Sequence, residues 1–395
     1  MEISPPKYVK TILKTLASHG HLACIVGGCV RDMVLGVAPN DWDVATSALP
    51  EEVMELFPDS KGTGIKHGTV TVKIGSKSAE VTTFRTDGEY KDHRHPEAVN
   101  FIGDLTGDLA RRDFTVNAMA ITSDGTFMDP FHGLEDIKNH LIRAVGEPAK
   151  RFEEDALRML RAFRFSSRLE FEIEEETMRA IRDNAHLAGT LAPERVRDEV
   201  EKILMSVSPS YLYDLIDCGL LDRYLNNHLS RRDGLDCIAD MPKKALPRFA
   251  AFCTVLEADE CIDSTWDFLT SLRLDGRTIN CCSASSSIVK TQPPEDRVTW
   301  KRLLRKYGVD AVECAASVWD AFYGTGNTES LKSVLKSGEC FSVRHLAING
   351  NDIASFGYKG KQIGEMLEFL LDYVIEYPEN NTHEKLMILC SNSDQ

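Results

Sequence analysis

The pattern of apolar and polar positions changes character close to residue 146. Before that point, short apolar and β-branched runs predict strands, and short segments with helical periodicity lie between them. After it, nearly every segment repeats apolar residues three and four positions apart, which predicts helices. We therefore expect an α/β unit followed by a helical part. In the first part the expected strands are 22–26, 42–45, 69–74, 79–84, 118–122 and 128–129, and the expected helices are 6–18, 30–35, 50–56 and 107–112.

Two segments of the first part carry more specific signals. Residues 67–84 read HGTVTVKIGSKSAEVTTF, which predicts a hairpin with GSKS as its turn. Residues 85–100 are polar, carry both signs of charge and show no periodicity. This composition predicts a mobile loop, and a lid and a plain surface loop are equally compatible with it.

The helical part begins with a continuous helical pattern at 151–169 and a second at 193–206, where Pro193 lies at the helix start. The segments 226–245 and 283–295 lack this pattern and predict linkers or irregular structure. The remaining expected helices are 209–216, 246–256, 264–272, 297–307, 309–319, 328–337, 350–355 and 361–377.

Composition and charge narrow the class of protein. The 395 residues are 43% hydrophobic and 27% charged, a soluble profile with room for more than one domain. No apolar run reaches the roughly 20 residues of a membrane span, and the first residues lack the apolar core of a secretion signal. We therefore expect a cytoplasmic protein without a membrane partner. The net charge of −15 argues against a surface that coats nucleic acid, while a local basic channel remains possible.

Eleven cysteines are scattered along the chain. They include no C-x-x-C pair, so a zinc site is not expected. Most have apolar neighbours, which is typical of reduced thiols that act as small hydrophobic side chains.

The first candidate for chemistry is the stretch IVGGCVRDMVLGVAPNDWDVAT at 25–46. Gly27 and Gly28 interrupt a strand ahead of a helical turn, where a backbone can approach phosphate closely. Asp41 and Asp43 open an extended stretch, so their side chains point the same way. Paired carboxylates suit Mg²⁺ when substrate phosphates complete the coordination. The alternative is a solvated turn acid followed by a strand-edge acid.

A third carboxylate lies on the second arm of the predicted hairpin. Glu80 would complete an acidic cluster if that arm paired beside the strand of Asp43. An edge-strand glutamate without a role is an equally good interpretation of Glu80 alone.

The second candidate is the arginine-rich segment 156–169, which contains no acids. On an ideal helix Asp155 and Arg158 are neighbours, whereas Arg164 lies roughly half a turn away. A carboxylate beside a guanidinium can read the amino group and ring nitrogen that cytosine and adenine share, and so reject guanine and uracil. The alternative is a solvated basic face balanced by the acids at 153 and 154. The four arginines are Arg158, Arg161, Arg164 and Arg168.

Together these motifs resemble those of the class II tRNA nucleotidyltransferases, the CCA-adding enzymes of the polymerase-β superfamily. The resemblance covers nearly the whole chain. It implies a polymerase-β-like α+β head with a mixed sheet, followed by an all-helical neck, body and tail. The implied domains are 1–146, 147–208, 209–296 and 297–395. The motifs are GGCVRD with DWDVAT, RRDFTVNAMA, EDALRMLRAFRF and LAPERVRDEV, and residues 347–386 resemble the tail of bacterial members.

The resemblance also implies the site and its partners. Two Mg²⁺ ions would bind Asp41 and Asp43, with Glu80 as a third catalytic carboxylate, while CTP, ATP and tRNA would be the substrates. Ribose recognition would fall on Arg111, Arg112, Asp113 and Asn117, and base recognition on Asp155 and Arg158. The other implied nucleotide contacts are Gly27, Gly28, Arg31, Arg161 and Arg164. The basic side chains proposed to carry tRNA, which fit solvated helix faces equally well, are Lys301, Arg302, Arg305, Lys306, Lys359 and Lys361.

Several related activities remain alternatives. Relatives that add only CC have a shortened loop between the first two motifs, and the full-length segment 85–100 favours complete CCA addition. An enzyme that adds only the final A is harder to exclude. A poly(A) polymerase is less favoured, because the chain shows no basic C-terminal extension of the kind those enzymes tend to carry. A catalytically silent RNA-binding relative is less favoured, because the set of candidate residues is intact. The sequence leaves the oligomeric state open.

Overall fold

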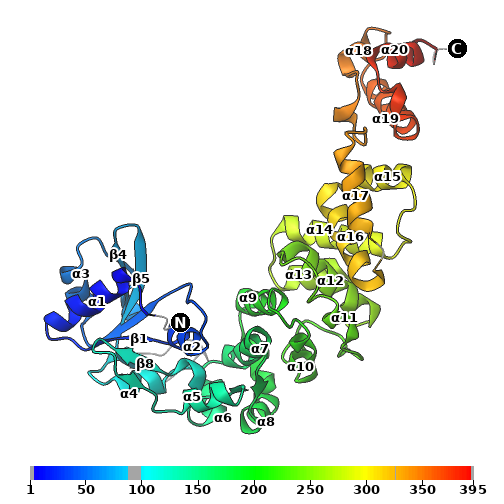
Figure 1. Ribbon diagram of the computed structural model, residues 1–395. Coiled ribbons are helices and arrows are strands. Elements are labelled where there is room, and N and C mark those ends of the chain that lie inside the picture. Colours follow the sequence, from blue (N-terminus) through cyan, green and yellow to red (C-terminus); the bar gives the residue numbers. More distant parts are fainter. Residues whose placement is uncertain (1–3, 88–98, 325, 393–395) are drawn as a thin grey trace. The chain divides into compact units, whose positions relative to one another are not determined.

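The computed structural model describes residues 4–87, 99–324 and 326–392, and divides into two compact units, Met1–Arg223 and Tyr224–Gln395 (Figure 1). The first unit contains a mixed sheet followed by helices, and the second is helical. The α+β fold class is therefore confirmed. The boundary at residue 223 falls inside the predicted body, 209–296, so the four-part division remains a prediction.

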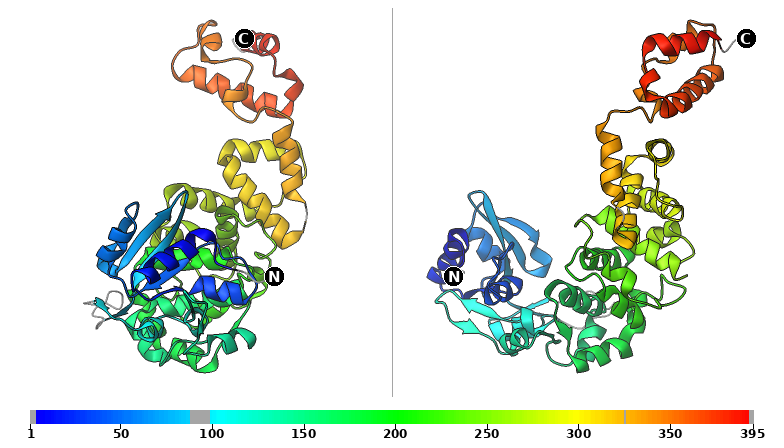
Figure 2. Two further views of the ribbon diagram at one scale, coloured as in Figure 1. Left: turned by 60° about the vertical axis from the view of Figure 1, so that its left-hand side comes forward. Right: turned by 45° about the vertical axis from the view of Figure 1, so that its right-hand side comes forward.

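A seven-stranded sheet with the strand order β3-β4-β5-β2-β1-β8-β9 forms the head. Only the β2–β5 pair within it is parallel, which makes the sheet mixed. Figures 1 and 2 show the hairpin of β4 and β5 in blue beside helices α1 (Lys7–Ser18) and α3 (Pro50–Leu56). The strands are β1 (Ala23–Val26), β2 (Asp43–Thr46), β3 (Lys61–Gly64), β4 (Thr69–Ile74), β5 (Lys77–Thr83), β8 (Ala120–Thr122) and β9 (Phe127–Met128).

The two faces of the sheet follow the alternation of side chains along its strands. Cys24, Val26 and Ala45 belong to a buried cluster on one face. Helices α1 (Lys7–Ser18) and α3 (Pro50–Leu56) pack against the sheet and against each other, and α1 buries one apolar stripe. This packing holds β2, which begins at Asp43, in its place within the sheet. The remaining helices of the head are α2 (Gly28–Val34), α4 (Leu105–Ala110) and α5 (Gly133–Lys138).

The segment predicted as an irregular loop at 85–100 is only partly described. Its ends form a two-stranded ladder of β6 (Arg85–Asp87) and β7 (Val99–Phe101), so the prediction was wrong there. The rest of that prediction, at 88–98, lies outside the described residues. The strand at 61–64 and helix α5 were not predicted either.

The predicted continuous helix at 151–169 is broken into α6 (Pro148–Glu154) and α7 (Leu157–Leu169). Asp155 has an extended backbone, with φ −143° and ψ 102°, and its carboxylate accepts a hydrogen bond from the Leu157 N–H at 3.1 Å. Asp155 therefore ends α6, and its carboxylate satisfies the first free N–H of α7. The rest of the first unit contains α8 (Glu175–Asn184), α9 (Pro193–Leu204), α10 (Tyr211–Asp217) and one short parallel ladder of β10 (Leu141–Ile142) with β11 (Glu172–Ile173).

The second unit is a succession of helices around two apolar clusters. Trp300 and Trp319 meet edge to face at 5.9 Å, and Leu370 lies in a separate cluster nearer the C-terminus. The irregular segment predicted at 283–295 is helical up to Val289. The helices are α11 (Asp233–Asp236), α12 (Ala245–Ala258), α13 (Thr265–Ser271), α14 (Gly276–Val289), α15 (Arg297–Tyr307), α16 (Val309–Tyr323), α17 (Asn327–Lys336), α18 (Gly350–Ala354), α19 (Lys361–Glu376) and α20 (His383–Asn392).

Short 3-10 turns occur in both units, at Ile65–His67, Thr115–Asn117, Ala185–Thr190, Val343–His345 and Pro378–Asn380. No helix among the described residues combines the length and the apolar character that a membrane crossing requires.

Candidate active site

The predicted acidic cluster forms where β2 and β5 run in parallel. Their register places Asp43 directly opposite Glu80, and Asp41 lies two residues before Asp43. Burial raises the pKa of Asp43; the nearby Arg112 guanidinium opposes this shift, while Glu80 and Asp41 add to it. The three carboxylates are thus close enough to interact electrostatically. Asp41 and Glu80 are exposed, so the cluster opens to solvent.

The cluster fits a cation that is also held by a substrate. Among the described residues, no three His, Cys, Asp or Glu side chains converge closely enough to form a metal site on their own. Asp41 and Asp43 would therefore need oxygen atoms from a bound molecule to complete a coordination shell. Divalent Mg²⁺ commonly binds in this way, through one or two carboxylates and substrate phosphates.

Gly27 and Arg112 form the wall next to these carboxylates. Gly27 has φ +78°, and a Cβ built there would lie 2.7 Å from Nη1 of Arg112 and 3.8 Å from Oδ2 of Asp43. Only glycine allows both this conformation and this close approach. Arg112 also contacts Asp108 at 3.4 Å, which orients its guanidinium. Gly27, Arg112 and Asp43, predicted from separate motifs, thus meet at one place.

Four further predicted residues form a continuous chain of hydrogen bonds. The buried Arg31 donates to Asn117 at 2.6 Å, and Asn117 donates to Asp113 at 3.1 Å. Asp113 accepts from Arg161 of α7 at 2.8 Å. Although burial opposes it, Arg161 and Asn117 lower the pKa of Asp113 to about 2. These hydrogen bonds connect the head to helix α7.

The two predicted base-reading residues have different hydrogen-bond partners. Asp155 accepts from Arg195 of α9 at 2.9 Å. Arg158 donates to Glu154 at 2.6 Å and to the carbonyl of Arg111 at 3.0 Å. The ideal-helix argument for their proximity was wrong, because the chain breaks at Asp155. The backbone N–H of Arg158 nevertheless donates to the carbonyl of Asp155 at 3.0 Å, so the two residues remain close at the start of α7.

The remaining arginines of α7 do not form a solvated basic face. Arg164 pairs with the buried Glu199 of α9 at 3.0 Å, and Arg168 pairs with Asp32 at 3.4 Å. Phe165 lies under Arg164, whose guanidinium carbon is 4.5 Å from the ring centroid. Burial and the neighbouring Arg161 lower the pKa of Arg164 to about 10. These contacts make α7 a rigid support for the residues at its start.

Sequence reasoning missed the acids and the arginine that hold the predicted residues. Asp108 pairs with Arg111 at 2.8 Å, in addition to its contact with Arg112. The motif LAPERVRDEV belongs to α9, but the sequence did not indicate which of its side chains contact Asp155 and Arg164. Glu154 was considered only as a balancing charge, and the missed residues are Asp108, Arg195 and Glu199.

The basic side chains suggested for tRNA in the second unit are largely engaged in ion pairs. Lys301 is buried and contacts Glu339 at 2.8 Å, which is a correction to its suggested role. Arg302 contacts Glu376 at 2.6 Å, and Arg305 pairs with Asp372 and Glu368 of the same helix, α19. These arginines join α15 to α19 and do not present a free basic surface.

Comparison with known proteins places the chain in a class and then in a family. Residues 23–143 match the family model of the poly(A) polymerase head domain, and residues 170–229 match one described as a probable RNA- and SrmB-binding site of polymerase A. With the carboxylates on β2 and the arginine-rich α7, this head defines a nucleotidyltransferase.

The relatives identify the family. A CCA-adding enzyme of Geobacillus sp. (strain WCH70) is 38% identical over 385 residues, covering 95% of this chain and 94% of that protein. One from Lactobacillus helveticus (strain DPC 4571) is 52% identical over 207 residues, covering 52% of this chain and 51% of that protein. The crystal structure of the Bacillus stearothermophilus CCA-adding enzyme in complex with CTP matches with a TM-score of 0.86 at 33% identity, covering 99% and 98% of the two chains. The chain belongs to the family of CCA-adding enzymes.

Proposed function

We propose that this protein adds C, C and A in turn to the 3′ end of tRNA, using CTP and ATP and releasing pyrophosphate. The observation that carries the proposal is the link between two predicted elements. Arg158, one of the proposed base-reading residues, donates to the backbone of Arg111 in the head motif that also contains Arg112. Arg112 in turn lies beside Gly27 and Asp43. These contacts connect the proposed base-reading arginine to the proposed metal-binding carboxylate within the first unit, which supports the proposal.

Asp41 and Asp43 are proposed to hold Mg²⁺ together with the triphosphate of the incoming nucleotide. The raised pKa of Asp43 fits this role, since a buried carboxylate among other acids needs a compensating positive charge. When bound, Mg²⁺ supplies charge neutralisation at the α-phosphate and activation of the tRNA 3′-hydroxyl. Glu80 is proposed as the third carboxylate of the cluster.

The phosphates and the ribose are proposed to bind between Gly28 and the second head motif. Arg112 faces the carboxylates and is the first candidate for a phosphate contact. Asn117 and Asp113 are proposed on the ribose side, where their hydrogen bonds to Arg31 and Arg161 keep them in fixed orientations. Because these groups are positioned before substrate binds, little reorganisation is needed during reaction.

Asp155 and Arg158 are proposed to select the base. The carboxylate accepts from the amino group of cytosine or adenine, and the guanidinium donates to the adjacent ring nitrogen. Arg161 and Arg164 are proposed as secondary nucleotide contacts, although both already have acidic partners. The domain division at 146, 208 and 296 is kept as a proposal, with tRNA bound by the last two parts. The eleven cysteines, all free, are consistent with a reducing compartment and support a cytoplasmic location.

A single assay tests the proposal. Purified protein is given a tRNA that lacks its CCA end, with CTP, ATP or both, and the product length is measured on a sequencing gel. We expect two added residues with CTP alone and three with both nucleotides. A tRNA ending in CC should gain a single A. No addition would indicate a silent relative, and growth to long A tracts would indicate a poly(A) polymerase. A stop after CC would indicate an enzyme that adds only CC, and addition only to a tRNA ending in CC would indicate one that adds only the final A.

Replacing Gly27 by alanine is expected to lower the efficiency of C and A addition at least tenfold, because the new Cβ would collide with Arg112 and would strain a backbone at φ +78°. The measurement is kcat/KM for CTP and ATP, with circular dichroism to check folding. Gly125→Ala is the matched control: this glycine has φ +90°, but no atom lies within 4 Å of its Cβ position. Equal losses in both variants would contradict a specific role for the Gly27–Arg112 contact.

A further inference from the structure

Two cysteines of the second unit lie in contact, although they are far apart in sequence. The sulfurs of Cys281 on α14 and Cys314 on α16 are 3.7 Å apart and 33 positions separate the residues. Helices α14 and α16 pack against each other, so the contact is part of the helical core. A disulfide needs the two sulfurs about 2.05 Å apart. The sulfurs are therefore in contact but not bonded in this structure.

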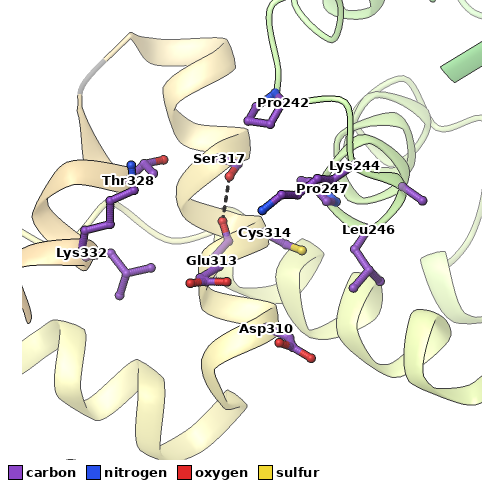
Figure 3. A pocket seen from close by; sticks show the side chains of 12 residues that line it. Pro242, Lys244, Leu246, Pro247, Asp310, Glu313, Cys314, Ser317, Thr328 and Lys332 are labelled. Carbon is purple, nitrogen blue, oxygen red and sulfur yellow. Dashed lines mark hydrogen bonds between the residues drawn. The ribbon is translucent and has the colours of Figure 1, made fainter. Parts of the chain in front are cut away.

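A cavity of about 470 Å³ gives small molecules a route to this pair. It lies between α16, α17 and the start of α12, and Cys314 is one of its lining residues (Figure 3). Cys281 lies directly behind Cys314. Both side chains are otherwise buried, so large reagents have no comparable access to them.

The charges around the pair favour its reaction over that of the other buried thiols. Either sulfur can be the donor in this contact, so the pair can hold one thiolate that the other thiol stabilises; with Cys314 as the donor, the contact lowers the pKa of Cys281. Arg277 also lowers the pKa of Cys281, whereas burial, Asp310 and Glu313 oppose the shift. In contrast, burial raises the pKa of Cys24 to about 12. Since thiolates are the reactive form, the pair is better placed to react than the other buried thiols.

We infer that Cys281 and Cys314 form a thiol-oxidation site, which a hydroperoxide entering through this cavity converts into a reversible intrachain disulfide. The pair releases one proton, and with Cys281 as the donor of the remaining S–H, Cys314 carries the negative charge. Its thiolate attacks hydrogen peroxide: an S–O bond forms, the O–O bond breaks and hydroxide leaves.

The sulfur of Cys281 then attacks the sulfenic sulfur of Cys314. The S–S bond forms, the S–O bond breaks, and the oxygen leaves as water with the second thiol proton. Hydroxide takes up the first proton, so two waters are produced. The two sulfurs together lose two electrons, and the peroxide gains them. A dithiol reductant reverses the reaction.

The test treats the reduced full-length protein with hydrogen peroxide, blocks the remaining thiols with N-ethylmaleimide and maps the peptides by mass spectrometry. We expect a Cys281–Cys314 crosslink that forms at least roughly tenfold faster than oxidation of any other thiol, and that dithiothreitol removes. The number of titratable thiols should fall by two from the initial eleven. Closing a loop of this length should also raise the thermal unfolding midpoint by roughly 5 °C.

Matched variants keep the inference falsifiable. Cys281→Ala and Cys314→Ala should each abolish the crosslink; Cys281→Ala should stop at sulfenic acid on Cys314, and Cys314→Ala should leave Cys281 unoxidised over the same time. Cys282→Ala is the control, because this neighbouring thiol on α14 is equally buried but donates to the Leu246 carbonyl. The Cys282→Ala variant treated with peroxide should still lose two titratable thiols, at the rate of the unaltered protein. The inference is overturned if peroxide oxidises other cysteines first, if it yields only sulfinic acid at the pair, or if a crosslink persists in either single variant.

Discussion

Replacing Asp43 by asparagine is expected to reduce addition of both C and A about 10³-fold or more, while binding of tRNA is retained. Asparagine keeps the size of the side chain and removes its charge, so the loss would report directly on cation binding. Charge stabilisation by a bound metal ion is worth several kcal/mol in reactions of this kind, which corresponds to this factor. The measurement is single-turnover incorporation at saturating CTP or ATP, with tRNA affinity determined separately.

The same substitution should not weaken the fold. Burial and the neighbouring Glu80 and Asp41 raise the pKa of Asp43 in the folded protein. A carboxyl group whose pKa is higher in the folded state than in the unfolded state destabilises the fold at pH values above both. Removing the charge relieves that cost, so the thermal midpoint of Asp43→Asn at pH 7 and without metal should equal or exceed that of the unaltered protein. An inactive variant that also unfolds more easily would argue against this explanation.

Two further variants test how specific the effect is. Glu80→Gln should lower activity less than Asp43→Asn, since Glu80 is exposed and lies opposite Asp43 across the parallel strand pair. Asp124→Asn is the matched control on the same head, because this aspartate accepts from the Thr126 N–H at 3.0 Å in the turn between β8 and β9. It should leave incorporation unchanged. Retained activity in Asp43→Asn would refute the metal assignment.

The sequence predicted the elements of the head that have strong local signals. The helix at 50–56 and the strand at 69–74 have the predicted bounds, because each combines a clear periodicity with a proline or glycine boundary. The strand Lys61–Gly64 was missed, since KGTG has two glycines and no apolar residue. It is a strand only because β4 supplies its hydrogen-bonding partner.

The helical segment 283–289 was missed because its serines are typical of loops. Asp275 caps the start of α14 by accepting from the Thr278 N–H at 3.1 Å. The buried Ser286 donates its hydroxyl to Glu257 of α12, so a polar side chain is satisfied inside the core. That partner lies 29 positions earlier in the sequence, so no local pattern could predict the contact.

The candidate site shows the same division between local and tertiary information. The sequence placed Glu80 on the second arm of a hairpin but left open whether that arm pairs with the strand of Asp43, and the parallel pairing of β2 with β5 supplies this contact. The partners of Asp155 and Arg158 were not accessible, because they depend on a break between two helices and on a third helix that packs against them. Motifs therefore located the reactive groups, whereas the residues that orient them required the fold.

Replacing Asp155 by alanine is expected to relax the choice of base more than it weakens nucleotide binding. A bidentate contact between a side chain and a base edge discriminates by about 1–3 kcal/mol, so the preference for C and A over U and G should fall roughly tenfold to a hundredfold. The measurement is the ratio of kcat/KM for CTP to that for UTP, and for ATP to that for GTP. An unchanged ratio would refute the base-reading role.

The contact between Arg195 and Asp155 separates positioning from direct recognition. Arg195→Met keeps most of the aliphatic stem but removes the guanidinium that donates to Asp155 at 2.9 Å. We expect a smaller loss of base discrimination than in Asp155→Ala, of roughly fivefold, because the carboxylate remains but is less well oriented. Arg179→Met removes an exposed guanidinium that pairs with Glu175 within α8, and it should leave the ratio unchanged. If Arg195→Met lowers the rates for all four nucleotides equally, then Arg195 stabilises the fold around α9 and does not orient the base-reading carboxylate.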